Sequence, residues 1–519
     1  MTDAAESADV ERSSGPLAAC AGAFLVVLLF HGVVPTDPDT PWHIAQARLM
    51  LHRWSDGHFT VNARDAFSWT AFGHRWHPNG WGFQAVLGVF YDVAGWPGVA
   101  LLRALLLGAL VVVAWRFSDR LEAGRWARAG AVWVAMVFVV PWATVRPQLV
   151  SFVLLVVCLD LTARALDSSR APPGDGNGSD TSPLVAHLVL AATIALWAAL
   201  HGAVVAGVVA LVIMCAGEAM DRRSWQRPLL TASVCVVASL ASPYGVSLWS
   251  YAVSNTKESE NLHIEEWRAP SITRGSDVAV MILLLGVAVV AVVLALRSGR
   301  GFGWRLLLPA LVLTAFTLQG IRNQPFALLA LLPFGAHALT AAGSALASHG
   351  WTLPMHPGRA VAAMSLGALL GGAIHLGASP LDVDPMQSPD YPQVAKALPS
   401  GCRLLNEYDF GGYVILARPD VPVSQDGRNN LYGPTNLHRQ ELLLEDARPG
   451  NADMELRRLG ITCVLAHEGR GLLASLAGLP GWRRLAADEA GEAWARGGDA
   501  GFQGDRSPES PLTDRDSPF

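Results

Sequence analysis

The chain has 519 residues, of which 51% are hydrophobic and only 16% are charged, and its formal net charge at pH 7 is −5. The length alone would fit several soluble domains, but this composition, with its positive mean hydropathy, is typical of a polytopic membrane protein. Because the net charge is slightly negative and no basic tract is present, we expect no nucleic acid among its partners.

Apolar stretches long enough to cross about 30 Å of hydrocarbon recur through the first three quarters of the chain. They predict a mainly α-helical membrane protein with about eleven transmembrane helices in a lipid bilayer. The predicted spans are residues 16–35, 96–117, 127–144, 148–166, 184–200, 202–219, 228–248, 277–297, 304–320, 324–341 and 359–377. The polar residues 1–15 and 500–519 are predicted to be disordered ends, and residues 167–182 a cytoplasmic linker.

Arginine-rich connections follow predicted spans two, four, six and eight, and such connections stay in the cytoplasm. Their arginines are Arg120, Arg125, Arg128, Arg164, Arg170, Arg222, Arg223, Arg227, Arg297, Arg300 and Arg305. This alternation predicts an inner N-terminus and, with eleven spans, an outer domain from residue 379 to 499. The expected location is a bacterial cytoplasmic membrane.

The first outer loop, residues 36–95, carries two acidic residues directly after the first predicted span. Asp37 and Asp39 are followed by Trp42 and His43, an aromatic ring and an imidazole that could contact a sugar. The two carboxylates could act as a general base or hold a divalent cation such as Mg²⁺ or Mn²⁺. The alternative is that they cap the helix predicted over Pro41 to Trp54.

A second group of polar residues in this loop includes His77 and Asn79, which are candidates for hydrogen bonds to a substrate. The neighbouring tryptophans suit a membrane interface for physical reasons alone. A short apolar stretch from Trp81 to Val93 is too short to span the bilayer, and it predicts interfacial or re-entrant packing.

Three arginines lie at or near span ends on the predicted outer side, where few positive charges are expected. They are Arg103, Arg146, which lies beside Gln148 in VRPQLV, and Arg322. Guanidinium groups bind phosphate in a bidentate manner, so these residues are candidates for a lipid-linked phosphate. Contact with lipid headgroups is the alternative.

Polar residues at two further outer connections could complete the same pocket. His201 interrupts an apolar hairpin, and Glu266 with Trp267 lies in the sequence IEEWRAP. The carboxylate of Glu266 could complement Asp39 across the cavity. A local hydrogen bond for His201 and a solvated loop charge for Glu266 are the alternatives.

The segment after residue 379 is predicted to be a small α/β domain. CRLLNEY, PDVPVSQ and ITCVLAH have the pattern of short strands, and residues 435–447 and 451–459 have that of helices. Cys402 and Cys463 lie beside two of these strands, and an oxidising compartment would allow them to pair.

Taken together, these motifs resemble a family of bacterial multi-pass membrane proteins that look like GT-C-fold glycosyltransferases. The matching segments are DPDTPWHIAQARLML, WHPNGW, VRPQL, LWAALHG, SPYG, IEEW, IRNQPF, NEYDFGGYVI and SQDGRNNLYG.

The resemblance implies transfer of a sugar from a polyprenyl-phosphate donor to an outer acceptor. Asp39 would act as the base, with Asp37 and Glu266 as the other candidate acids, and arginines would hold the phosphate. The sequence departs from the family at Gly80, where relatives often have an acidic residue. A secondary transporter or a scaffold in envelope polymer assembly are the alternative interpretations.

Overall fold

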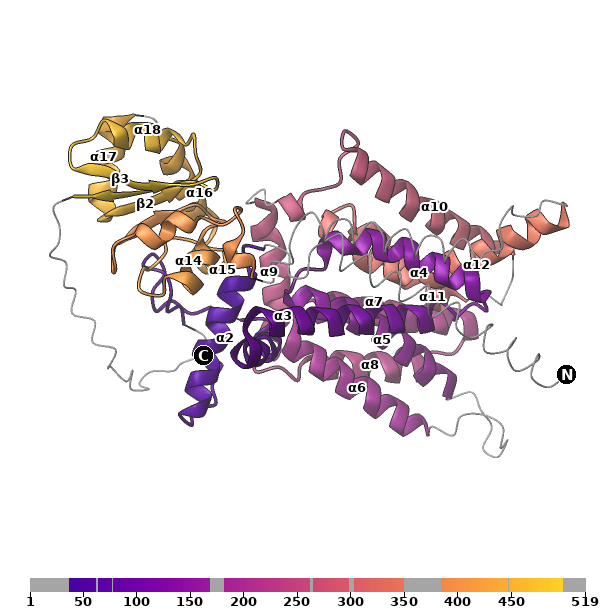
Figure 1. Ribbon diagram of the computed structural model, residues 1–519. Coiled ribbons are helices and arrows are strands. Elements are labelled where there is room, and N and C mark those ends of the chain that lie inside the picture. The colour runs from indigo at the N-terminus through magenta and orange to yellow at the C-terminus, as the bar shows by residue number, and fades with distance from the viewer. Residues whose placement is uncertain are drawn as a thin grey trace, which may run out of the picture.

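The computed structural model describes residues 37–61, 64–76, 78–168, 182–261, 265–297, 303–349, 384–446 and 448–497. The predicted spans 16–35 and 359–377, both predicted disordered ends and nearly all of the predicted linker lie outside these residues. The described chain forms a helical part and a smaller part that contains a sheet, which lies beyond one end of the helices (Figure 1).

The first described helix is α2 (Thr40–Ser55), which corresponds to the helix predicted in the first loop. The helices of the helical part come after it in the chain. Its elements are α3 (Trp81–Phe117), α4 (Arg125–Val139), η1 (Val140–Trp142), α5 (Pro147–Ser168), α6 (Pro183–Leu200), α7 (Val204–Arg222), α8 (Gln226–Ser239), α9 (Ser247–Asn261), η2 (Glu265–Trp267), α10 (Gly275–Arg297), α11 (Trp304–Phe316), η4 (Ile321–Asn323) and α12 (Gln324–Ser348). Many apolar side chains on these helices are exposed, as expected of a surface that faces lipid.

Within the described residues, six helices are long and apolar enough to cross a membrane, so the chain is a multi-pass membrane protein. These spans are Trp81–Phe117, Pro147–Asp167, Pro183–Leu200, Val204–Arg222, Gly275–Leu296 and Ile321–Ser348. The predicted spans 127–144, 228–248 and 304–320 contain helices of only 15, 14 and 13 residues. The predicted number of eleven is therefore not confirmed.

Helix α3 bends sharply at Gly95, whose φ of 61° and ψ of −143° are accessible to glycine and strained for other residues. Pro97 follows, and it cannot donate a backbone hydrogen bond within the helix. The short apolar stretch from Trp81 to Val93 is thus the first arm of α3, joined to the predicted span from residue 96 by this bend.

The described arginines of the arginine-rich connections lie at the end of the helical part opposite the sheet. Ion pairs join the helices there: Arg120 Nε contacts Asp160 Oδ1 at 2.6 Å, and Arg305 contacts Asp167 at 2.7 Å. This arrangement follows from the helix directions, because α5 and α7 run away from the sheet and α4 and α6 run back towards it. Where these connections are described, they therefore lie at one end of the bundle, as predicted.

The C-terminal part contains a mixed sheet of four strands in the order β1-β2-β4-β3. Its strands are β1 (Leu404–Asn406), β2 (Cys463–Ala466), β3 (Trp482–Ala487) and β4 (Glu492–Arg496). Strands β1 and β2 are parallel, and β4 runs antiparallel to both β2 and β3. The helical elements are η5 (Pro385–Gln387), η6 (Gln393–Ala397), α14 (Gly411–Ala417), α15 (Asn429–Tyr432), α16 (Pro434–Glu445), α17 (Pro449–Leu459) and α18 (Gly471–Ala477).

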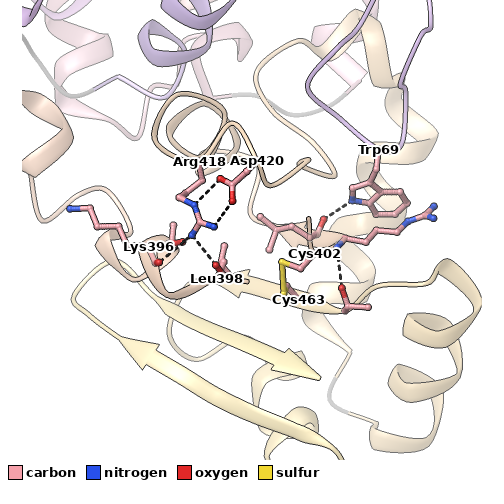
Figure 2. Close-up of a disulfide and its surroundings, with 11 residues drawn as sticks. Trp69, Lys396, Leu398, Cys402, Arg418, Asp420 and Cys463 are labelled. Carbon is pink, nitrogen blue, oxygen red and sulfur yellow. Dashed lines mark hydrogen bonds and ion pairs between the residues drawn. A yellow bond between two sulfur atoms is a disulfide. The ribbon is translucent and has the colours of Figure 1, made fainter. Parts of the chain in front are cut away.

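Two of the three predicted strands form, and the predicted helices correspond to α16 and α17. The strand predicted over PDVPVSQ is wrong: this segment makes only an isolated bridge between Val423 and Ser68 of the first loop. Its apolar residues are buried against that loop, which explains its strand-like pattern. Cys402 and Cys463 form a disulfide with their Cα atoms 6.0 Å apart, beside the parallel strands (Figure 2).

Candidate active site

Asp37 and Asp39 precede α2, and only Asp37 caps it. Asp37 Oδ1 accepts hydrogen bonds from the backbone N–H groups of Asp39 (2.7 Å) and Thr40 (3.4 Å). The Asp39 side chain caps no backbone group, and its Oδ1 instead accepts the indole N–H of Trp42 at 3.0 Å. The capping alternative therefore describes Asp37, and the Asp39 carboxylate is directed elsewhere.

Arg146 brings the acidic residues of two distant connections together. It lies just before Pro147, the first residue of α5, and its Nε donates to Asp37 Oδ2 at 2.6 Å. Its terminal nitrogen Nη1 lies 3.0 Å from Asp39 Oδ2 and 3.4 Å from Glu266 Oε2. The three candidate acids predicted from the sequence thus converge on one guanidinium group.

Arg322 extends this cluster from the other side of Glu266. Its Nη1 donates to Glu266 Oε1 at 3.1 Å, and its Nη2 lies 3.4 Å from Gln148 Oε1. The ring of Trp267 lies 4.0 Å from the Arg322 guanidinium carbon, a cation–π contact that orients the guanidinium. Gln148 and Trp267, both predicted to bind substrate, therefore contact the arginine next to the acids.

The charges in this cluster do not cancel, because three carboxylates face two guanidinium groups. Burial raises the pKa of Asp39 to about 6; Arg146 opposes this shift and the charge of Asp37 adds to it. Burial would also raise the pKa of Asp37, but Arg146 and hydrogen bonds hold it below its ordinary value. Asp37 is thus a fixed charge, whereas Asp39 can exchange a proton near neutral pH.

The C-terminal part covers the two aspartates directly. The Tyr391 hydroxyl donates to the Asp37 carbonyl at 2.5 Å and lies 3.0 Å from its N–H. Gly427 lies so close to Asp39 that a Cβ there would overlap Asp39 Oδ1. The charge of Asp39 also adds to burial in holding the pKa of Tyr408 well above its ordinary value. Neither tyrosine was predicted as a site residue, although Tyr408 lies in the motif NEYDFGGYVI.

A buried ion cluster fixes the segment that carries Gly427. The Arg428 side chain is 1% exposed and contacts Asp65 at 2.6 Å and Asp426 at 2.6 Å. The burial of Asp426 and Arg428 favours a structural role for both. Asp65 was not singled out in the sequence, since a lone acid in a loop carries no distinctive pattern.

Trp42 and His43 are both buried, each with 6% of its surface exposed. The imidazole Nδ1 of His43 lies 2.9 Å from Gln84 Nε2, and burial lowers the pKa of His43 to about 3, with Arg146 acting in the same direction. His43 is therefore neutral at pH 7. In this arrangement both residues position Asp39 and its surroundings, and sugar contact by Trp42 stays a prediction.

The remaining candidates lie around this cluster or outside the described residues. His201 directly follows α6, and its Nδ1 lies 2.7 Å from Ser151 Oγ, which also accepts the Trp197 indole N–H. This contact is the local hydrogen bond that was the alternative to a catalytic role. Asn79 lies beside Gly202, the next residue after His201. His77 is outside the described residues.

Arg103 is fully buried in α3, and its Nε donates to the Ala143 carbonyl at 2.8 Å. Ala143 is three residues before Arg146, so Arg103 supports the turn that presents Arg146. A direct contact between Arg103 and a phosphate stays a prediction.

Close packing requires a small residue at Gly80. A Cβ at this position would lie 2.7 Å from Pro147 Cγ, directly beside Arg146. A larger side chain there would displace the start of α5.

The donor set of Asp37 and Asp39 is one that Mg²⁺ or Mn²⁺ accepts, but the arrangement does not fit a cation between them. Arg146 already lies within 3.0 Å of both carboxylates and supplies the positive charge. Within the described residues, the group with ligand atoms close enough to hold a metal is Glu407, Asp409 and His467 in the C-terminal part. There too, Arg470 makes two hydrogen bonds of 2.8 Å to Glu407.

No protein-family model matches the sequence, and no curated protein is similar to it in sequence. Solved structures do match. The oligosaccharyltransferase AglB from Archaeoglobus fulgidus, in complex with an inhibitory peptide and a dolichol-phosphate, has a TM-score of 0.60 at 11% identity, covering 88% of this chain and 70% of that chain. The fold is that of GT-C glycosyltransferases.

Two further structures agree with this GT-C fold. An oligosaccharyltransferase from Archaeoglobus fulgidus in complex with Zn and sulfate has a TM-score of 0.54 at 13% identity and covers 92% of this chain and 73% of that chain. ArnT from Cupriavidus metallidurans in the apo state has a TM-score of 0.55 at 13% identity and covers 94% of this chain and 98% of that chain. The resemblance inferred from the motifs is confirmed at the level of the fold.

Proposed function

We propose that this chain is a membrane glycosyltransferase that transfers a sugar from a polyprenyl-phosphate donor to an acceptor on the extracytoplasmic face. The observation that carries the proposal is the convergence of Asp39, Glu266, Arg146 and Arg322 under the C-terminal part. A scaffold has no need to gather these side chains, and a transporter would place ionisable groups at the midplane of its helices. The complex of AglB with a dolichol-phosphate supports a lipid-linked donor for this fold.

In the proposed reaction, the acceptor hydroxyl attacks the anomeric carbon of the donor sugar and Asp39 takes its proton. The bond between the anomeric carbon and the phosphate oxygen breaks, and the electron pair leaves with the phosphate. A carboxylate with a pKa of about 6 is ionised at neutral pH and still basic enough to accept this proton.

The arginines would stabilise the departing phosphate. Among the described residues, the Arg322 guanidinium contacts Glu266, Gln148 and the Trp267 ring, so it can also bind a phosphate at the edge of the cluster. Arg146 is held by Asp37 and supplies positive charge beside the base. Fixed positive groups aimed at a leaving phosphate lower the barrier because they need no reorganisation during the reaction.

The experiment that tests this proposal compares Asp39→Asn with Asp37→Asn, using a set of polyprenyl-phosphate sugars and envelope acceptors. We expect Asp39→Asn to lower turnover by about 10² to 10⁴, the contribution of a general base. Asp37→Asn should be milder, because an amide oxygen still accepts the backbone N–H of Asp39.

The matched control is Asp92→Asn, since Asp92 is an exposed aspartate paired with Arg48 on the same loop and should leave turnover unchanged. Folding of each variant is checked by its yield and melting temperature in detergent. Full turnover in a folded Asp39→Asn variant would move the base to Glu266 or remove catalysis from this site.

A further inference from the structure

The first arm of α3, from Trp81 to Val93, carries an exposed stripe of valines. Val86, Val89 and Val93 are separated by three and four residues, the spacing that places side chains on one face of a helix. They are 40%, 49% and 81% exposed. A surface helix of a soluble protein normally presents polar side chains on its exposed face. This stripe therefore indicates that the arm does not face water.

The opposite face of the first arm packs against α2. A Cβ at Gly88 would lie 2.7 Å from the Cβ of Ala47, and Gln84 Nε2 lies 2.9 Å from His43 Nδ1. Gln84 and Gly88 are both buried and lie four residues apart, so they belong to one contact face. The valine stripe lies about half a turn away from this face. Helix α2 therefore leaves the valines uncovered.

Both ends of the first arm lie at the same end of the helical part. At its start, a Cβ at Gly80 would lie 2.7 Å from Pro147, the first residue of α5, and a Cβ at Gly82 would lie 2.8 Å from the carbonyl oxygen of Ala199, near the end of α6. At its other end, the bend at Gly95 leads into the second arm of α3. The first arm therefore runs across the end of the bundle that carries the candidate site.

This end of the bundle is a level at which the helices leave the hydrocarbon. The second arm, residues 96–117, is about 33 Å long, so it crosses about 30 Å of hydrocarbon without the first arm. Its side chains Leu101, Leu105 and Val112 are between 52% and 54% exposed, as expected of a surface that faces lipid. Two exposed apolar surfaces of one helix thus meet at the bend, where the span ends.

Aromatic residues at the bend fit the same level. The rings of Tyr91 and Trp96 lie on either side of Gly95 in an edge-to-face contact, with their centroids 5.5 Å apart. Tyrosine and tryptophan are enriched where a membrane meets water. Because the valine stripe adjoins the lipid-facing surface of the second arm, the lipid bilayer is the occupant that this surface fits.

We propose that the first arm of α3 lies in the plane of the bilayer surface nearest the C-terminal part, with Val86, Val89 and Val93 inserted among the lipids. Since α2 packs on the other face of the arm and begins directly after Asp39, the arm also holds Asp39 at the depth of the lipid headgroups. The lipid contact stands on the packing alone. The placement of Asp39 rests on the proposed function, because the phosphate of a polyprenyl-phosphate donor lies at that depth.

Spin labels on single cysteines test the lipid contact in the full-length protein, reconstituted in vesicles of phosphatidylethanolamine and phosphatidylglycerol. The variants are Val89→Cys and Val93→Cys, with Val86→Cys in place of one that fails to fold. Leu105→Cys is the control for a lipid-facing span, and Met454→Cys, at an exposed position of α17, is the control for water. Electron paramagnetic resonance compares collisions of each label with oxygen, which concentrates in lipid, and with a water-soluble nickel chelate. The unchanged protein gives the background, which should be low because the described free cysteines are buried.

We expect both labels on the first arm to collide more with oxygen, at a depth of about 5 to 10 Å in the headgroup region, which is shallower than the label at position 105. More collisions with the nickel chelate, as at position 454, would show a helix that faces water and would overturn the proposal. Poor access of both reagents would show that protein covers the stripe, and a depth equal to that at position 105 would show a re-entrant arm. Either result would also overturn it.

Turnover of Val89→Asp tests the placement of Asp39. A charge on the lipid face should move the arm towards water and lower kcat with a polyprenyl-phosphate sugar about tenfold, a loss of about 1.4 kcal/mol. The melting temperature in detergent should stay the same, because the Val89 side chain is exposed. Val89→Leu should keep full turnover, and Met454→Asp is the matched control for the added charge.

The two parts of the proposal and the proposed function fail in different ways. Full turnover in Val89→Asp would overturn the placement of Asp39 and leave the lipid contact standing. Absence of transfer by the unchanged protein from any lipid-linked donor would reject the proposed function together with the placement of Asp39. The spin labels decide the lipid contact in either case.

Discussion

Asp37 and Asp39 are two residues apart and differ in almost every physical respect. Asp37 is 2% exposed and bound by backbone N–H groups and by Arg146, so its charge is fixed. The Asp39 side chain is 19% exposed, and its pKa is raised to about 6. One carboxylate therefore orients the arginine while the other is able to exchange a proton, a division of roles that is common in active sites.

The pKa of Asp39 predicts how transfer depends on pH. A base must be ionised, and a carboxyl group with a pKa of about 6 is protonated below that value. We therefore expect kcat/KM to rise about tenfold per pH unit below 6 and to level off above it. Measurement between pH 4.5 and 8 with a stable donor would check this, and a flat profile from 5 to 7 would exclude Asp39 as the base.

The geometry of Arg146 and Arg322 predicts that lysine cannot replace them. Lysine keeps the charge but not the planar fork that contacts two carboxylates or a phosphate. A lost charged hydrogen bond is worth about 1.5 to 3 kcal/mol, or roughly ten- to a hundredfold in donor affinity. Donor titrations of Arg146→Lys and Arg322→Lys would measure this loss.

The control for these variants is Arg48→Lys, since Arg48 is exposed and forms an ion pair with the exposed Asp92. If both site variants kept the donor affinity of the unchanged protein, headgroup contact would be the better account of these arginines.

At the scale of elements, the site depends on close packing between α2 and the segments around α14. Gly412 approaches the Pro38 carbonyl and Gly427 approaches Asp39 so closely that neither position has room for a Cβ. The buried cluster of Arg428 with Asp65 and Asp426 holds the second of these segments. The C-terminal part is therefore a wall of the candidate site.

This packing predicts that Gly427→Ala displaces Asp39. We expect overpacking to cost about 1 to 3 kcal/mol of stability and turnover to fall. The midpoint of the pH profile should also move, because Asp39 would change its distance from Arg146. Gly450→Ala is the matched control, since a Cβ at Gly450 meets nothing within 4 Å. A lower melting temperature with an unchanged pH midpoint would show that Gly427 affects stability alone.

At the scale of the whole molecule, the helix directions place the described arginines of the arginine-rich connections at one end and the candidate site at the other. Arg120, Arg222 and Arg305 lie at the far end in ion pairs, whereas Arg146 and Arg322 lie beside the C-terminal part. The positive-inside rule then predicts that the far end is cytoplasmic.

Single cysteines introduced by Arg223→Cys and Arg457→Cys would test this orientation, each in an otherwise intact chain. The described free cysteines are buried, so they should add little background. We expect a membrane-impermeant reagent added from outside to label position 457 and not position 223. The reverse result would place the site in the cytoplasm and remove an extracytoplasmic acceptor from the proposal.

The sequence by itself determined the membrane class, most helix positions, the shared end of the described arginine-rich connections and which acids and arginines are candidates for the site. These features follow from local hydropathy and from charges that are costly at span ends, so they can be read along the chain. The GT-C resemblance also followed from motifs in chain order.

Only the tertiary structure decided which of these residues touch and what covers them. Arg146 contacts Asp37, Asp39 and Glu266, and its contact with Glu266 joins residues 120 positions apart in the sequence. Tyr391 contacts Asp37 across a sequence separation of 354 residues. The wrong strand at PDVPVSQ has the same cause, since burial by the first loop imitates a sheet pattern. Burial also sets the pKa of Asp39, and burial is a property of the packed molecule that no local pattern contains.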